Sequence, residues 1–182
     1  MPTYIALLRG INVGPHKRTK MEKLRSACEG LGFENVTTYI QSGNIVFRAA
    51  KLSDAALAKK LGDCIARDFG FPADVITRTQ EEMGEIIANN PLLKEKNIEQ
   101  SKLHVVFLSG KPTPESLHKL QALTVAPDRV RNLDREIYFY FPNGVSRSSL
   151  WKHPLDKVLT VTSTMRNWNT VNKLYEMARE LE

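Results

Sequence analysis

The residues best suited to chemistry lie in one short segment near the start of the chain. This loop combines side chains that bind anions with glycines that keep backbone N–H groups accessible: Arg9, Asn12, Gly14, His16, Lys17 and Arg18. Between residues 9 and 25 there are six Lys or Arg residues and a single acid, Glu22, which gives a local charge of +5. Open backbone N–H groups and a helix N-terminus both attract anions. The segment therefore predicts an anion site.

A second segment, Ser42-Gly43-Asn44, separates two runs rich in β-branched and aromatic residues and predicts a hairpin turn. In a βαββ unit with right-handed crossovers, the first two strands run parallel, so the first loop and this turn share one edge of the sheet. We expect Arg9 and Asn44 to meet there and to hold an anion with a guanidinium fork, loop N–H groups and an amide. In the alternative, Gly10 and Gly14 only turn the chain, Arg9 binds carbonyls, and the turn has no further role.

Arg166 and Asn167 form a third candidate, because beside Trp168 they could hold an anion and stack a ring. In the alternative, Trp168 belongs to an apolar core stripe and Thr164 caps a helix. Residues 129–173 carry eight Lys or Arg residues against three acids, a second local +5, which permits a nucleic-acid surface. The strand aromatics available for base stacking are Tyr39 and Tyr138, and the aromatic motif of an RNA-recognition domain is missing.

Motifs of known catalytic and metal sites are missing from the sequence. The histidines at 16, 104, 118 and 153 are scattered, and there is no His-Glu-x-x-His motif and no nucleophile elbow. Cys28 and Cys64 have no second Cys or His at ligand spacing, so we expect no metal site, no disulfide framework and no cofactor. Of the histidines, only His16 lies in the basic loop, where it could act as an acid or base.

The pattern of apolar residues and turn signals predicts the elements that position these residues. In the first 79 residues we expect the order βαββαβ of the ferredoxin-like fold. The expected elements are a strand at 3–8, a helix that begins with a Thr19/Glu22 capping box, hairpin strands at 36–41 and 45–48, a helix from Ser53 to Gly70 and a strand at 74–79.

The second part of the chain repeats this order. The expected elements are a helix from a Thr79/Glu82 capping box to Asn89, a polar connector at 92–101, a strand at 103–108, a helix capped by Thr113, hairpin strands at 129–133 and 136–141, a helical segment interrupted by Pro154 and a last helix from Thr164. The fold class expected is α+β, with two ferredoxin-like halves, 1–79 and 80–182, packed into one compact unit. The second half is divergent and carries the C-terminal helices.

Composition sets the class of protein. The chain has 182 residues, a net charge of +6, 42% hydrophobic residues and 25% charged residues, which is typical of a globular protein. Its longest apolar runs, 4–8 and 105–108, are far shorter than a membrane span, and Arg9 ends the first before a signal-peptide cleavage site could follow. We therefore expect a cytoplasmic protein with no membrane partner.

Several separated motifs carry a resemblance to a known family. The segments Ile5-Ala6-Leu7-Leu8-Arg9-Gly10-Ile11-Asn12-Val13-Gly14, Met21 to Leu24, Thr38-Tyr39-Ile40-Gln41-Ser42-Gly43-Asn44 and Arg166-Asn167-Trp168-Asn169-Thr170-Val171 resemble those of the bacterial family known as domain of unknown function 1697. The resemblance runs from the first strand to the last helix and implies an α/β fold with ferredoxin-like parts. It implies no catalytic residue. The chain differs from the family pattern at Pro15 and His16, where a second small residue is common.

Our functional hypothesis is a protein that binds a phosphate-bearing ligand or a nucleic-acid backbone at the basic loop. The candidate residues are Arg9, Asn12, Gly14, Lys17, Ser42, Gly43, Asn44, Arg166 and Asn167. One alternative is an enzyme acting on a small phosphorylated or carboxylated substrate that Arg9 and Asn12 orient. Another is a structural or protein-interaction module. A concave pocket joining Arg9 to Asn44 would favour the enzyme, a flat basic face would favour nucleic acid, and the presence of neither would favour the structural or protein-interaction module.

Overall fold

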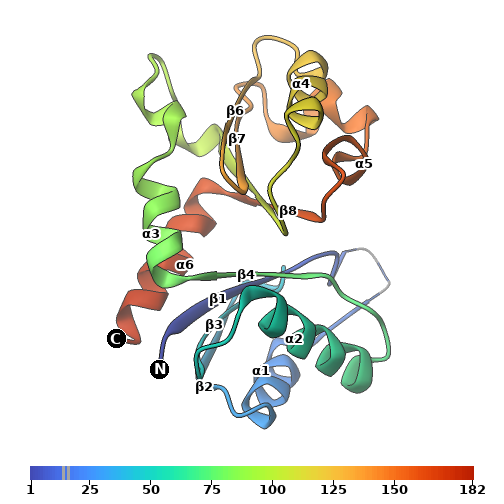
Figure 1. Cartoon of the computed structure of the whole chain (residues 1–182), viewed down its shortest axis with the longest axis vertical. Coiled ribbons are helices and arrows are strands. Elements are labelled where there is room, and N and C mark those ends of the chain that lie inside the picture. Colours follow the sequence, from blue (N-terminus) through green and yellow to red (C-terminus); the bar gives the residue numbers. More distant parts are fainter. Residues whose placement is uncertain (14, 16) are drawn as a thin grey trace. The chain divides into compact units, whose positions relative to one another are not determined.

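The residues described in the computed structural model, all but 14 and 16, form two four-stranded antiparallel sheets, each with its own helices (Figure 1). Gly14 and His16, two residues of the predicted anion loop, lie outside the described part. The chain divides into two compact units. The first unit comprises Met1–Glu85 and Lys173–Glu182, and the second comprises Ile86–Asn172. The α+β class is therefore confirmed.

The sheet of the first unit has the strand order β2-β3-β1-β4, with every neighbouring pair antiparallel. Its elements are β1 (Thr3–Leu8), α1 (Met21–Gly30), β2 (Glu34–Tyr39), β3 (Asn44–Arg48), α2 (Asp54–Phe69), β4 (Val75–Thr79) and the start of α3 (Gln80–Ala88). In the register, Leu7 lies opposite Asn44 and Ile5 lies opposite Arg78. The expected hairpin at residues 36–48 is confirmed.

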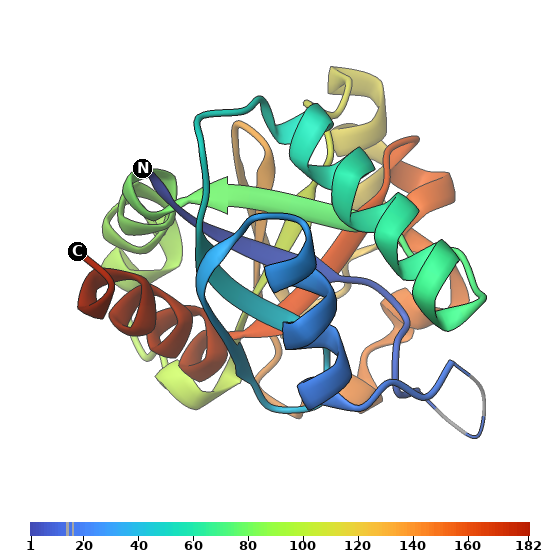
Figure 2. The ribbon, with the colours of Figure 1, turned by 90° about the horizontal axis from the view of Figure 1, so that it is seen from below.

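One face of this sheet packs against α1 and α2 (Figure 1, Figure 2). The core contains alternate residues of the strands together with the apolar stripes of both helices: Tyr4, Ala6, Leu8, Leu24, Cys28, Ile45, Phe47, Leu57, Leu61 and Ile65. All six residues of β1 are buried, those on the opposite face included. This explains why β1 is a continuous apolar run and shows no alternation in the sequence.

Most of the predicted helix ends are confirmed. Ser53 Oγ accepts a hydrogen bond from the N–H of Ala56, and Gly70 ends α2 in the left-handed region. Thr79 and Glu82 form the predicted reciprocal capping box, with bonds of 2.8 and 3.1 Å.

The capping box predicted from Thr19 and Glu22 is wrong. The helix α1 begins one residue later than this box requires, with Lys20 at the N-cap, and none of the described side chains caps it. The N–H of Thr19 instead donates to Oδ1 of Asn12 at 2.7 Å, which keeps Thr19 in the loop. Thr19 is therefore part of the loop that precedes the helix.

The sheet of the second unit has the order β6-β7-β5-β8, which matches the first sheet strand for strand. Its elements are η1 (Pro91–Lys94), η2 (Gln100–Lys102), β5 (Leu103–Leu108), α4 (Pro114–Leu123), β6 (Arg129–Leu133), β7 (Glu136–Tyr140), η3 (Val145–Arg147), η4 (Ser149–Lys152), α5 (Leu155–Leu159), β8 (Ser163–Asn167) and the start of α6 (Trp168–Glu180). Thr113 caps α4 as expected, by accepting from the N–H of Ser116.

The expected start of the last helix at Thr164 is wrong. Residues Ser163–Asn167 form β8, which pairs with β5 along its length, and α6 begins only at Trp168. The cap is Asn167, whose Oδ1 accepts from the N–H of Thr170 at 2.8 Å. The sequence between 163 and 167 has no helix breaker, so strand pairing with β5 determines its conformation here.

Burial of Trp168 makes it the strongest test of the core. Its side chain is only 4% exposed, which supports its assignment to the core. We expect Trp168→Ala to lower the free energy of unfolding by about 3–5 kcal/mol, because a large ring leaves a cavity. Urea denaturation measures this loss. Trp151→Ala is the matched control, since Trp151 is 37% exposed and its removal should have a much smaller effect. Equal losses would contradict the assignment.

His104 makes the stability of the second unit depend on pH. Burial lowers the pKa of this imidazole, and a backbone hydrogen bond with Lys102 opposes the shift only in part. The unfolded chain, in which His104 has its ordinary pKa of about 6.5, takes up a proton more readily than the folded protein. The folded state is therefore fully stabilised above that pKa and loses stability relative to the unfolded chain as the pH falls below it. We expect the melting temperature to fall as the pH is lowered from about 7.5 to about 5.5, a range that brackets that pKa. His104→Gln should flatten this part of the curve, and an unchanged slope would contradict the assignment.

Candidate functional site

The loop after β1 and the turn between β2 and β3 lie side by side in the first unit. The N–H of Leu8 donates to the carbonyl of Gly43 at 2.8 Å, and Nδ2 of Asn12 donates to the carbonyl of Gln41 at the same distance. These bonds join segments about thirty residues apart in the sequence. The expectation that loop and turn share one edge of the sheet is confirmed.

Asn12 holds the loop in shape. Its Nδ2 also donates to the carbonyl of Thr19 at 3.0 Å, while its Oδ1 accepts from the N–H of Thr19 at 2.7 Å. Its own N–H donates to the carbonyl of Lys17, and its φ of 54° lies in the left-handed region that Asn tolerates. With both ends of the amide engaged, Asn12 is a positioning residue in this structure.

The turn is built around Gly43. Its φ is 81°, and a Cβ at this position would lie 2.6 Å from Cβ of Leu8 and 2.7 Å from Cδ1 of Ile11. Asn44, fully buried, donates from Nδ2 to the carbonyl of Tyr39 at 3.0 Å and to Oγ of Ser42 at 2.9 Å. The bonds of Asn44 fix the turn itself, and the close approach of Gly43 to Leu8 and Ile11 places the turn against the first strand and its loop.

Arg9 is positioned by the strand on the other side of β1. Its N–H donates to the carbonyl of Asp74, and its guanidinium lies 4.0 Å from the Asp74 carboxylate, just before β4. Asn44 belongs to β3, and the strand order places β3 and β4 on opposite sides of β1. Joint binding of one ligand by Arg9 and Asn44 stays a prediction.

Beside this edge lies a pocket of about 500 Å³, which we call the α1 pocket. It is lined by residues from the loop, from the start of α1, from the turn and from the end of α2: Asn12, Arg18, Thr19, Lys20, Lys23, Gln41, Asp68 and Phe69. Three cations thus face one carboxylate. Asn12 is the lining residue that the predicted set contains, and Lys20 and Lys23 belong to the basic segment that predicted the site. Gln41 lies in the motif 38–44 but was not a candidate, and nothing in the sequence marked Asp68 or Phe69 as site residues.

Asp68 is an ionised acceptor at the α1 pocket. Its carboxylate accepts from Nε of Arg67 at 2.7 Å, from Nη2 of Arg67 at 3.1 Å and from the Cys64 thiol at 3.5 Å. The hydrogen bonds from Arg67 lower the pKa of Asp68 below its ordinary value. Asp68 therefore carries its negative charge at neutral pH and can accept hydrogen bonds from a ligand.

Thr19 contributes a polar group at the wall of the α1 pocket. Its side chain is 7% exposed, and its Oγ1 has no hydrogen-bond partner among the residues that the structure describes. Buried hydroxyls are nearly always paired, so this one is an exception among the buried polar groups of the described residues.

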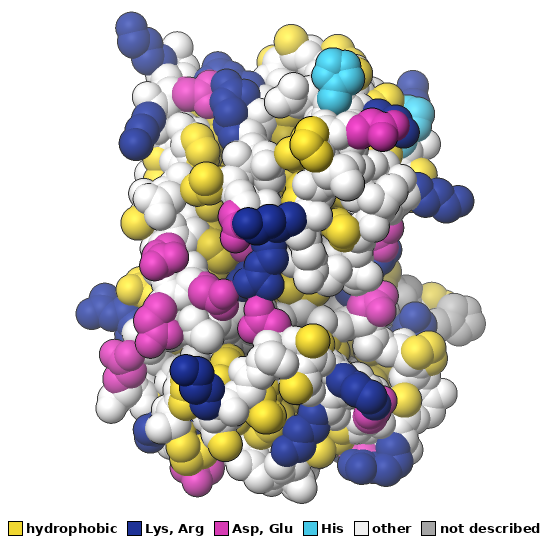
Figure 3. Space-filling model, in the orientation of Figure 1, with side chains coloured by type: hydrophobic (Ala, Val, Ile, Leu, Met, Phe, Trp, Pro, Cys, Tyr) yellow, Lys and Arg dark blue, Asp and Glu magenta, His cyan; other side chains and the backbone are white. Residues whose placement is uncertain are grey.

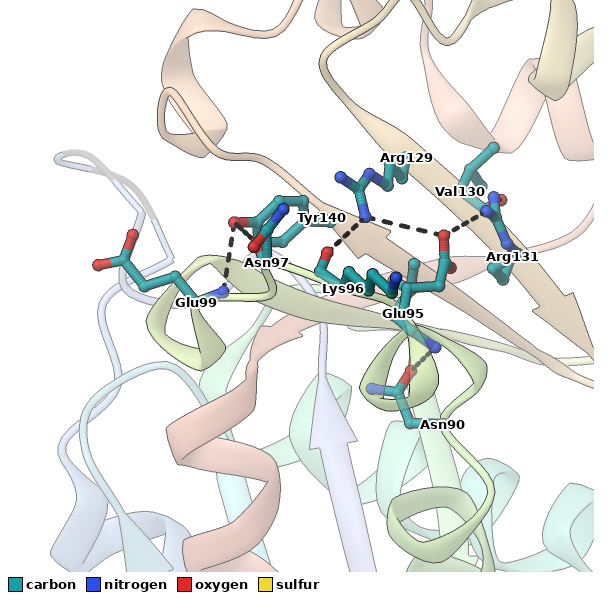
Figure 4. Close-up of polar contacts among 10 residues, drawn as sticks. Asn90, Glu95, Lys96, Asn97, Glu99, Arg129, Val130, Arg131 and Tyr140 are labelled. Carbon is teal, nitrogen blue, oxygen red and sulfur yellow. Dashed lines mark hydrogen bonds and ion pairs between the residues drawn. The ribbon is translucent and has the colours of Figure 1, made fainter.

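Two arginines of the second basic region, Arg129 and Arg131, are engaged within their own unit (Figure 4). Oε1 of Glu95 lies 2.6 Å from Nη2 of Arg131 and 3.8 Å from Nη1 of Arg129. The Tyr140 hydroxyl donates to the carbonyl of Asn97 at 3.2 Å. These contacts fasten the connector at 92–101 to β6 and β7, so the two arginines have a structural role.

Arg166 and Asn167 also serve the fold. Arg166 is 9% exposed, and its Nη1 donates to Oγ1 of Thr164 at 2.8 Å and to the carbonyl of Met165 at 2.9 Å. Burial lowers the pKa of Arg166 to about 10, so it stays charged at neutral pH. Asn167 caps α6. A ligand role for this pair stays a prediction.

The surface and the thiols limit other chemistry. Tyr138, one of the two strand aromatics available for base stacking, is fully buried and donates to the carbonyl of Ile86, so it offers no platform for a base. Within each unit, the face seen in Figure 3 has Lys and Arg side chains interspersed with acids.

Burial raises the pKa of the Cys28 thiol to about 12, which makes it a poor nucleophile.

Neither a metal centre nor a membrane span is found in the described ranges. No group of three His, Cys, Asp or Glu residues comes together there. Every helix within these ranges is too short or too polar to span a lipid bilayer.

Gly43 gives the sharpest test of this geometry. We expect Gly43→Ala to lower the free energy of unfolding by about 1–2 kcal/mol for the left-handed backbone and by a further ~1–3 kcal/mol for the contact with Leu8 and Ile11. Gly10→Ala is the control, because Gly10 has a φ of 71° but no atom near its Cβ position, so only the first effect applies. Urea denaturation of both variants gives the difference. Equal losses would mean that the close approach is unimportant.

The comparisons with known proteins agree with this fold. The chain is similar to a solved structure described as conserved bacterial protein SP0830 from Streptococcus pneumoniae, with 25% identity and a TM-score of 0.79 over 97% of this chain and 98% of that one. None of the curated proteins matches the sequence. The family model that matches residues 1–138 is described as Protein of unknown function (DUF1697), which confirms the family suggested by the motifs; the motif at 166–171 lies outside the matched range. The chain therefore belongs to the DUF1697 family.

Proposed function

We propose that the first unit binds a small phosphate-bearing ligand in the α1 pocket. The observation that carries this proposal is the lining of the pocket by Arg18, Lys20 and Lys23 at the start of a helix, against a single carboxylate. A volume of about 500 Å³ lies within the range of small-molecule pockets. A concave site of this size favours a compact ligand over an extended polymer.

The start of α1 adds to the attraction. The first N–H groups of a helix have no partner within it, and the helix dipole places partial positive charge there. None of the described side chains caps α1, so a ligand oxygen can accept these bonds. Lys20 and Lys23 are exposed and project from the same first turn. Phosphate groups bind such helix starts readily.

The second unit provides an internal comparison. Its helix α4 occupies the place of α1, but only residues 109–113 separate it from β5, and Thr113 caps it. The corresponding loop of the first unit runs from 9 to 20 and carries the cations. We infer that the longer loop is what adapts a common framework to bind a ligand. We also infer that the halves 1–79 and 80–182 are both ferredoxin-like, because each follows a βαββαβ order with matching strand positions.

The other hypotheses are weaker. A nucleic-acid surface over 129–173 loses three of its eight cations, because Glu95 engages Arg129 and Arg131 and because Arg166 is buried. The exposed Arg147, Lys152 and Lys157 do not line the α1 pocket. In the enzyme hypothesis, Arg9 and Asn12 orient a substrate at the same edge of the sheet. Such a substrate must first bind there, so the enzyme hypothesis includes the binding that is proposed here. In this proposal the remaining candidate residues shape the edge of the sheet and its electrostatic potential: Arg9, Lys17, Ser42, Gly43 and Asn44. We propose a cytoplasmic location for the protein.

Binding of inorganic phosphate and pyrophosphate to the full chain tests this proposal. Titration calorimetry at low salt should detect both, with pyrophosphate binding more tightly because it carries more charge. We expect Lys23→Gln to weaken binding by about twofold to fivefold, the size of an exposed charge contact. Lys59→Gln is the matched control, because Lys59 is an exposed lysine of α2 that pairs with Asp63 outside the pocket.

Two outcomes would contradict the proposal. Neither anion binds at millimolar concentration, or Lys23→Gln and Lys59→Gln weaken binding equally. The second result would mean that the net charge of the protein, and not the α1 pocket, attracts the anion.

A further inference from the structure

We propose that the ligand of the α1 pocket is a nucleoside monophosphate, a phosphate joined to a sugar with free hydroxyls and to a flat ring. This inference rests on the proposed function. It starts from two lining residues that an inorganic anion does not explain, Asp68 and Phe69, both from the last turn of α2.

Asp68 would repel a bare phosphate, so its presence in the lining calls for a ligand with a donor. Arg67 holds the carboxylate in a two-bond fork, which fixes its orientation. Its Oδ1 receives only the bond from Nε of Arg67 among the described contacts and keeps further acceptor capacity. Sugar hydroxyls are the donors that a fixed carboxylate binds in nucleotide sites.

Phe69 supplies an apolar surface next to this carboxylate. It is half-buried, with one part packed against the core of the first unit and another part in the lining. Its ring is tilted by 45° to that of Phe71, with 6.4 Å between centroids, so the two rings are not stacked. An aromatic ring at a pocket wall accepts the flat face of a base regardless of the base's identity.

The cations complete the arrangement from different elements. Arg18 comes from the loop, and Lys20 and Lys23 come from the start of α1, whereas Asp68 and Phe69 come from the end of α2. The α1 pocket thus presents positive charge, an acceptor and an aromatic ring within one volume of about 500 Å³. A nucleoside monophosphate offers a partner to each of these groups.

Three probes separate the contributions in titration calorimetry with the full chain: inorganic phosphate, ribose 5-phosphate, and adenosine or uridine 5′-monophosphate. We expect ribose 5-phosphate to bind about tenfold more tightly than phosphate, since hydrogen bonds to a charged acceptor strengthen binding. Each nucleotide should gain about another tenfold from stacking, with little difference between the two bases.

Two variants assign these gains to residues. Asp68→Asn should abolish most of the gain from the sugar while leaving phosphate affinity unchanged or higher, because a negative charge is removed. Phe69→Leu should remove the gain from the base and keep the gain from the sugar. Asp63→Asn is the control, since Asp63 lies on the same helix, pairs with Lys59 and does not line the pocket.

The outcomes distinguish the two proposals. If phosphate binds and the nucleotides bind no more tightly, the inference fails and phosphate binding stands. If Asp68→Asn and Asp63→Asn behave alike, the inference also fails. If no probe binds, the proposed function itself is wrong.

Discussion

The side-chain amide of Asn12 joins the loop before α1 to the β2–β3 turn, two segments that the pairing of β1 with β3 brings to the same edge of the sheet. It bonds to the backbone of Thr19 at both ends of the amide and to the carbonyl of Gln41. The first set of bonds closes the loop before α1, and the last ties that loop to the β2–β3 turn. Because Thr19, Gln41 and Asn12 all line the α1 pocket, its shape depends on these hydrogen bonds. A small polar side chain that tolerates positive φ suits this position.

The two units use the same backbone framework around this edge. In each unit, the last residue of the first strand, β1 or β5, donates to the neighbouring hairpin turn. The residue after it donates to the segment that precedes the edge strand, β4 or β8. The bonds run from Leu8 to Gly43 and from Arg9 to Asp74 in the first unit, and from Leu108 to Arg135 and from Ser109 to Thr162 in the second. The units differ in the connection from the central strand to the first helix. A short capped connection leads into α4, and a long basic loop leads into α1.

Sequence patterns predicted the elements whose ends depend on local chemistry. Ser53, the Thr79/Glu82 pair and Thr113 cap helices as expected, because a cap needs only neighbouring residues. Thr19 failed as a cap because a distant residue, Asn12, takes its N–H. The strand β8 was missed because its partner, β5, lies over fifty residues away. The sequence did not predict Asp68 and Phe69 as site residues for the same reason, since the packing of α2 on the sheet brings them to the α1 pocket.

Charge counting gives the same +5 for 9–25 and for 129–173, yet the structure uses these charges differently. In the second segment, Arg129 and Arg131 share one carboxylate and Arg166 lies inside the protein. Arg166 takes the fourth place in β8, as buried Arg78 does in β4, so a buried arginine belongs to the strand framework of both units. In the first segment, by contrast, exposed cations surround a helix start and line a cavity. A cation that has a carboxylate partner or is buried contributes little to attracting a ligand. The proposed anion site therefore rests on cations that line one cavity, and not on the local charge alone.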